Sequence, residues 1–231
     1  MASPPTKFDF DFYESKPKEL IYQVDAHFPK ETPFLRLTKT DDHDTPLQRS
    51  TGRVLYSKPV AFGHGGAKAD FETTVKFIVR VKAKTPHADG LVFFIVPEGH
   101  AFPSAAMGGN LGIFEPSGKS SHVFAVAFDI YPTTPGYITL GICIESRIPK
   151  SVIQVPDSFV GKELTLGVSY VAATGLISAS VSDGSETFPV SFVYNLSEIL
   201  PPRVQVGLAS STGEYVVVHD VASWGFKSTI S

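Results

Sequence analysis

Apolar and polar side chains alternate at every second position along much of this chain. In the stretch 7–13, Phe8, Phe10 and Phe12 occupy alternate positions, with Lys7, Asp9 and Asp11 directly before them, and apolar residues again dominate every second position of the stretch 71–81. Successive side chains of a β-strand point to opposite faces of a sheet, so this alternation predicts half-buried strands. No stretch carries a sustained apolar stripe with the 3.6-residue period of a helix, and we therefore expect a fold made of sheets.

Turn residues separate many further strand-like segments. Thr174-Gly175 and Asp183-Gly184 each lie between two such segments and predict hairpins, because these pairs suit tight turns. At most one helical turn is expected at 195–200, where Pro201-Pro202 stops it. Many short strands with Gly and Pro turns predict a sandwich or barrel. The further predicted strands are 90–96, 123–129, 137–145, 164–171, 176–182, 187–194, 204–211 and 215–224.

The composition bounds the class of protein. The chain has 231 residues, 42% hydrophobic and 19% charged, which suits one well-buried domain over 1–231. A net charge of −3 argues against a broad nucleic-acid surface and against electrostatic membrane docking. No apolar run reaches the roughly 18 residues that span a bilayer. Residues 1–5 lack an apolar signal region, so we expect a cytosolic protein or the mature form of a secreted one. The single cysteine, Cys143, lies in an apolar stretch and is expected to be a buried, inert thiol.

The sequence carries no recognisable catalytic motif. Gly63-His64-Gly65-Gly66 lacks the Gly-Lys-Ser/Thr ending of a phosphate loop, and we interpret it as a flexible loop. No Gly-x-Ser-x-Gly elbow is present. A glycosidase needs two carboxylates flanking the scissile bond. Asp9 and Asp11 alternate, but opposite three Phe residues on the first strand, where a solvated outer face is expected. We therefore predict a non-enzymatic protein.

A set of short motifs resembles those of the legume lectin family, in the same order and over nearly the whole chain. Each motif is weak by itself, and the ordered set is specific. The resembling segments are Ala-Asp-Gly-Leu-Val-Phe-Phe at 88–94, Gly-Gly-Asn-Leu-Gly-Ile-Phe at 108–114, Val-Ala-Phe-Asp at 126–129, Val-Gly-Leu-Ala-Ser-Ser-Thr-Gly at 206–213, His-Asp-Val-Ala-Ser-Trp-Gly-Phe at 219–226, and shorter matches at 35–40 and 52–60.

The resemblance implies an all-β jelly-roll sandwich with a flat back sheet, a curved front sheet and a small third sheet. It also implies a sugar site in loops above the front sheet. Asp89 would accept hydrogen bonds from two sugar hydroxyls, as an ionised carboxylate can. The Gly109 N–H would donate to the sugar, and Tyr131 would stack on its apolar face, with Phe124 or Tyr137 as alternatives.

The loop 210–214 completes the site that the resemblance implies. Ser211 and Glu214 are its candidate carbohydrate-binding residues. In the family, the peptide before the sugar-binding Asp is cis, and here it is Ala88–Asp89. Two outcomes stay open for this bond, because it could relax to trans or be supported by direct packing of the shortened loop nearby.

The metal-binding positions depart from the family pattern. The family holds manganese and calcium through a Glu, two Asp, an Asn, a His and an aromatic residue's carbonyl. Here Ala127 replaces the Glu, Thr133 the Asn and Thr139 the His, while Asp129 remains. The loop 132–136 is several residues short and has no second Asp. One carboxylate is too few for calcium, and a specific transition-metal site needs imidazole or thiolate partners. We predict no metal and no other cofactor, and we expect Asp129 to bond to Thr or backbone groups.

The sequence leaves two functions open. The first is a carbohydrate-binding lectin that recognises glycans without metals. The alternative is a lectin-like defence protein of the arcelin or α-amylase-inhibitor type, which acts by protein–protein contact. The resemblance further implies a homo-oligomer, a dimer or tetramer, and a secreted or vacuolar location, while a cytoplasmic one stays open. In a secreted protein the sequon Asn195-Leu196-Ser197 would matter.

Overall fold

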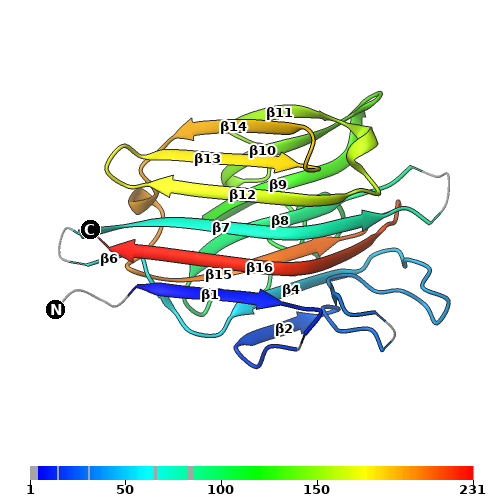
Figure 1. Ribbon diagram of the computed structural model, residues 1–231. Helices are drawn as coiled ribbons and strands as arrows, with labels where there is room; N and C mark the ends of the chain where they lie inside the picture. The colour runs from blue at the N-terminus through cyan, green and yellow to red at the C-terminus, as the bar shows by residue number, and fades with distance from the viewer. Residues whose placement is uncertain (1–4, 15, 31, 65–66, 83–85, 231) are drawn as a thin grey trace.

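Two antiparallel sheets pack face to face in the computed structural model, which describes residues 5–14, 16–30, 32–64, 67–82 and 86–230. The first sheet lies in front in Figure 1 and the second lies behind it. The order across the first sheet is β1 (Thr6–Asp11), β16 (Val218–Ile230), β7 (Ala67–Arg80), β12 (Glu163–Val171), β13 (Leu176–Ser182) and β14 (Thr187–Val193), with β3 (Leu35–Arg36) beside β16 and β6 (Gly63–His64) beside β7.

The second sheet carries the segments that form the candidate site. Its order is β11 (Ser151–Pro156), β10 (Tyr137–Ser146), β9 (Lys119–Thr134), β8 (Gly90–Pro97), β15 (Arg203–Ser211), β4 (Thr51–Tyr56) and β2 (Leu20–Val24), with β5 (Val60–Ala61) beside β15.

Helix is confined, within the described residues, to three 3₁₀ turns of three residues each: η1 (Gly108–Asn110), η2 (Asp157–Phe159) and η3 (Leu196–Glu198). None of these helices is long or apolar enough to cross a membrane. The single turn η3 lies where the sequence predicts one.

The main core lies between the two sheets and follows the predicted alternation. Phe8 and Phe12 are buried while Asp9 and Asp11 are exposed. The ring of Phe8 packs edge-on against Trp224, with centroids 4.9 Å apart. Burying one such aromatic side chain contributes on the order of 2–3 kcal/mol, so these residues fix which face of β1 is inside.

A second apolar cluster covers the other face of the second sheet. The segment 98–118 crosses this face, and Leu111, Ile113 and Phe114 pack there against Val92 and Phe94. Burial on both faces explains why β8 is a nearly continuous apolar run rather than an alternating one. The same packing holds η1 beside the start of β8.

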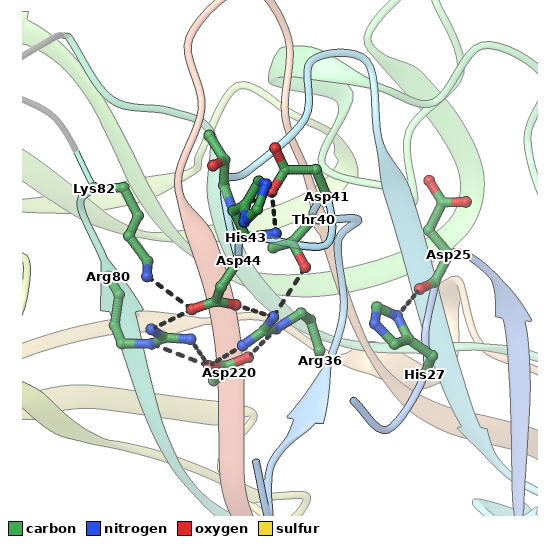
Figure 2. A network of polar contacts seen from close by, with 11 residues as sticks. Asp25, His27, Arg36, Thr40, Asp41, His43, Asp44, Arg80, Lys82 and Asp220 are labelled. Carbon is green, nitrogen blue, oxygen red and sulfur yellow. Dashed lines mark hydrogen bonds and ion pairs between the residues drawn. The ribbon is translucent and has the colours of Figure 1, made fainter. Parts of the chain in front are cut away.

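A cluster of five charged side chains joins the end of β7, the start of β16 and the segment 36–44 (Figure 2). Buried Asp220 accepts hydrogen bonds from Arg36 Nε at 2.7 Å and from Arg80 Nη2 at 2.6 Å. Asp44 pairs with Arg36, with Arg80 at 3.0 Å and with Lys82 at 2.8 Å. Burial raises the pKa of Asp44, but hydrogen bonds from the three cations outweigh it and hold that pKa well below its usual range. This arginine–aspartate cluster fixes the end of β7 and the start of β16.

Several sequence predictions need correction. Gly63 and His64 form the short strand β6 rather than a loop, while Gly65 and Gly66 lie outside the described residues. The last strand begins at Val218, not at residue 215. The sixteen strands of the described residues connect into two large sheets, and the short β6 joins the first of them only through β7. The hairpins at Thr174-Gly175 and Asp183-Gly184 are confirmed.

Candidate functional site

Strands β9 and β10 form a tight hairpin where the sequence predicts a loop. Strand pairing extends to Thr134 opposite Tyr137, so Pro135 and Gly136 alone make the turn. Gly136 has a φ of +81°, a backbone conformation that glycine adopts without steric cost. The register shifts between Tyr137 and Thr139, and this bulge absorbs the extra residues of β9.

A cavity of about 480 Å³ lies on the outer face of this hairpin. Its floor consists of alternate residues of β9 and β10, which point away from the main core because strand side chains alternate. Gly141 leaves room for Pro149, because a Cβ at position 141 would lie 2.8 Å from Pro149 Cβ. The cavity is lined by Asp89, Gly109, Leu111, Ala127, Asp129, Tyr131, Thr139, Gly141, Cys143, Arg147, Ile148 and Pro149.

Asp89 is held by backbone bonds on both sides. Its N–H donates to the Ser211 carbonyl at 3.1 Å, and its carbonyl accepts from the Ile130 N–H at 2.9 Å. The preceding peptide, Ala88–Asp89, is cis, which settles the alternative left open by the sequence. The side chain is 5% exposed, and its Oδ2 has no hydrogen-bond partner among the described residues.

The carboxyl of Asp89 has a raised pKa. Burial, aided by the negative charge of Asp129, raises its pKa to about 7, although the Gly213 N–H acts in the opposite direction. Glycine at positions 108 and 213 keeps side chains away from Oδ2: Cβ atoms there would lie 3.9 and 3.4 Å from it. The Gly213 N–H makes no hydrogen bond of normal geometry to this carboxyl, so the structure places a buried acceptor without a partner among the described residues at the edge of a cavity.

Gly109 lies in η1, which is tied to the end of β15. The Gly108 N–H donates to the Thr212 carbonyl at 3.3 Å, and Ser211 Oγ donates to the Gly108 carbonyl at 2.6 Å. Ser211 is fully buried and does not line the cavity, so its predicted contact with a sugar is replaced by a bond that positions η1.

The three aromatic residues predicted to stack on a sugar differ in exposure and in whether they line the cavity. Tyr131 lines the cavity, is 44% exposed and stacks on Tyr215 at 6.0 Å between ring centroids. Phe124 is fully buried between the sheets, because it lies among the alternate residues of β9 that face the main core. Its prediction as a sugar-stacking residue was therefore wrong. Tyr137 is exposed but does not line the cavity. Exposed Glu214 also lies outside the lining, and its carbonyl accepts from Gln48 Nε2 at 2.7 Å.

The residues present do not fit the metals that the family resemblance implies. Asp129 Oδ1 accepts from the Tyr131 N–H at 2.9 Å, which is the backbone bond expected for this leftover acid. Burial raises the pKa of the Cys143 thiol to about 12, with Asp129 adding to the shift, so no thiolate is offered. No three His, Cys, Asp or Glu side chains of the described residues gather into a metal-binding group. Calcium needs six to eight oxygens, and this cavity offers two carboxyls and a Thr opposite Asp129.

The sequence reasoning missed the cavity wall formed by Arg147, Ile148 and Pro149. These residues follow β10 directly, and the Arg147 N–H donates to the Gly118 carbonyl at 2.8 Å. The signal in the sequence is weak: a basic residue before an X-Pro pair at a strand end is common in turns. Tyr215, which supports Tyr131, was also missed.

The chain matches the family model of the legume lectin domain over residues 5–231. A lectin of Leucomphalos mildbraedii is 35% identical over 232 residues, covering 96% of this chain and 95% of the relative. A mannose/glucose-specific lectin of Centrolobium tomentosum is 31% identical, covering 99% of this chain and 97% of the relative.

Solved structures of lectins share the fold over almost the whole chain. The metal-free form of lectin I-B4 from Griffonia simplicifolia superposes with a TM-score of 0.87 at 31% identity, covering 97% of this chain and 99% of that one. The winged bean acidic lectin, solved with methyl-α-D-galactose, gives 0.86 at 29% identity, covering 99% of this chain and 100% of that one.

Proposed function

The chain belongs to the legume lectin family, and from that premise we propose that it binds carbohydrates at the Asp89 cavity without metal ions. The observation that carries the proposal is the buried Asp89 Oδ2, an acceptor with no partner among the described residues. A buried acceptor without a donor costs free energy, and a sugar hydroxyl supplies that donor on binding. We infer that the protein acts by binding alone.

The other lining residues suit a sugar ring. Gly109 lines the same cavity as the carboxyl, and we assign its N–H as a donor to the sugar. Half-exposed Tyr131 offers an aromatic face to the apolar side of the ring. Leu111, Ile148 and Pro149 add apolar walls. A volume of about 480 Å³ falls within the range of small-molecule pockets.

Metal independence is the second part of the proposal. The backbone on either side of Asp89 is held by Ser211 and Ile130, and η1 is held by the Ser211 hydroxyl. These bonds come from the protein itself. The β9–β10 hairpin replaces the longer loop that the family uses for metal ligands, so the site is complete without an ion.

Calorimetric titration of chelator-treated protein with a panel of neutral monosaccharides tests the proposal. We expect binding that does not change when calcium and manganese are added. Asp89→Asn should abolish it, because the amide presents one acceptor in place of a carboxylate. Asp157→Asn removes an exposed carboxylate in η2 and serves as the matched control.

Three other outcomes would count against the proposal. Binding that requires added metal would contradict the proposal that the site works without ions. Binding that survives Asp89→Asn would place the sugar elsewhere. No binding to any sugar, including those on a glycan array, would favour the protein–protein alternative, which inhibition of an α-amylase would support.

A further inference from the structure

The side chain of Arg147 lies in a cradle made by two glycines. A Cβ at Gly118 would lie 2.8 Å from Arg147 Nε and 3.1 Å from its Cδ, and a Cβ at Gly109 would lie 3.0 Å from its Nη1. The arginine stem therefore runs along the backbone of Gly118, and its guanidinium lies against Gly109. A side chain at either glycine would displace it.

The backbone of Arg147 is fixed as well. Its N–H donates to the Gly118 carbonyl at 2.8 Å, and its carbonyl accepts the Cys143 thiol at 3.6 Å. Pro149 packs over Gly141 two residues later. The guanidinium is thus held at the cavity wall even though Arg147 has an exposed surface.

The guanidinium has donors to spare. No ion pair within the described residues includes Arg147. Arginine presents a planar fork of N–H groups that matches the two oxygens of a carboxylate. The cavity therefore contains an acceptor without a donor, Asp89 Oδ2, and a guanidinium, Arg147, that makes no ion pair within the described residues although Asp129 is near enough to feel its charge.

We propose that Arg147 makes the site selective for acidic sugars, with the carboxylate of a uronic acid on its guanidinium and ring hydroxyls on Asp89. This inference rests on the proposed function and names its ligand class. A hexuronic acid carries both groups on one ring, and a cavity of about 480 Å³ has room for it.

Asp129 is the charge that opposes this arrangement. Its Oδ1 accepts the Tyr131 N–H at 2.9 Å, which takes up part of its charge. The negative charge of Asp89 is engaged by sugar hydroxyls in the proposed complex. Burial raises the pKa of Asp129 while the charge of Arg147 acts against that rise, so the two groups attract each other without forming an ion pair. The ligand carboxylate then faces the guanidinium on the wall segment formed by Arg147, Ile148 and Pro149.

The test compares glycosides that differ only at C6. Methyl β-glucuronide and methyl β-glucoside form one pair, and the corresponding galacturonide and galactoside form a second, because the ring stereochemistry is open. Hydrogen bonds between an arginine and a carboxylate are stronger than neutral ones, so wild-type protein should bind the acid of the preferred pair about tenfold or more tightly than its neutral partner. High salt should weaken this preference.

Variants assign the preference to one side chain. Arg147→Gln should remove the difference between acid and neutral glycoside, and Arg147→Lys should restore part of it. Lys150→Gln removes a positive charge three residues away that does not line the cavity, and it should keep the full preference.

Each remaining result overturns the inference. Equal affinity for acid and neutral sugars, or a preference for the neutral one, excludes an anion on Arg147 while leaving the proposed function intact. An equal loss for both ligands in Arg147→Gln would make the residue a structural brace. Loss of preference in Lys150→Gln would mean a general charge effect. Absence of binding to all four glycosides and to a glycan array would remove the proposed function and the inference together.

Discussion

The carboxyls of Asp89 and Asp129 line one cavity, where burial raises the pKa of Asp89 and the negative charge of Asp129 raises it further. Asp89 immediately precedes β8, and its carbonyl accepts the N–H of Ile130, the residue after Asp129, at 2.9 Å. Two acids thus share one site, so its binding properties should depend on pH.

Affinity for a neutral glycoside should rise with pH. The pKa of Asp89 is raised to about 7, so the acceptor form predominates above that value. If the protonated form does not bind, affinity at pH 5 should be roughly 10- to 100-fold weaker than at pH 8. Calorimetry with a neutral methyl glycoside measures the profile. Asp129→Asn should move its midpoint to lower pH, and a flat wild-type profile would contradict the prediction.

The free energy of unfolding should depend on the same titration of Asp89, but it should fall as the pH rises, whereas the affinity for the sugar rises. A carboxyl whose folded pKa lies above its unfolded value stabilises the protein below about pH 4, and that contribution is lost as the pH rises to about 7. At pH 8, Asp89→Asn should therefore be more stable than wild type by on the order of 1–3 kcal/mol, and at pH 4 the difference should vanish. Urea unfolding at the two pH values measures this, and a variant less stable than wild type at pH 8 would refute it.

Ser211→Ala should weaken sugar binding without removing a sugar contact. The Ser211 hydroxyl positions η1 through the Gly108 carbonyl at 2.6 Å. Losing this bond should cost about 1 kcal/mol of stability and several-fold in affinity, because Gly109 loses its support. Tyr22→Phe is the matched control, since the Tyr22 hydroxyl donates to the Pro17 carbonyl at 2.8 Å and does not line the cavity. Equal affinity losses in both variants would show a general stability effect.

Local patterning predicts the sheets better than it predicts the cavity. In β1 one face is apolar and the other charged, so alternation alone identifies the buried side of Phe8. In β9 the residues on both faces are apolar and buried, so the sequence pattern does not show which of them face the main core. The inward position of Phe124 could therefore not be predicted. The residues 132–136 have turn chemistry, and only pairing with β10 extends β9 as far as Thr134.

The position of Arg147 could not be predicted from local sequence. It depends on two glycines, at 109 and 118, that approach it from other segments, so the information lies in tertiary contacts. The family resemblance identified Asp89, Gly109 and Tyr131, which the structure brings to one cavity. It placed Ser211 and Glu214 near the site, but neither lines the cavity.

Buried His219 should make the protein sensitive to acid. Burial lowers the pKa of His219 to about 3, and its Nδ1 lies 3.0 Å from Thr38 Oγ1. A histidine with a depressed pKa contributes stability above about pH 6.5 that is lost as the pH falls toward 3, because the unfolded chain takes up the proton. His219→Gln should therefore lose less stability than wild type between pH 7 and pH 4.5, by about 1–3 kcal/mol. Urea unfolding at both values checks this, and parallel losses would contradict it.

Asp220→Asn should be the most destabilising single change in the arginine–aspartate cluster. Asp220 is fully buried and bonds both Arg36 and Arg80, so the amide removes the buried anion of the cluster and leaves the partly exposed Asp44 as the one carboxylate that both guanidinium groups share. Breaking a buried pair from one side typically costs about 3–5 kcal/mol. Thermal and urea unfolding measure the loss. The control is Glu72→Gln, which removes an exposed partner 3.7 Å from Lys227 and should change stability by less than about 0.5 kcal/mol. A similar small effect for Asp220→Asn would mean that the cluster is dispensable for the ends of β7 and β16.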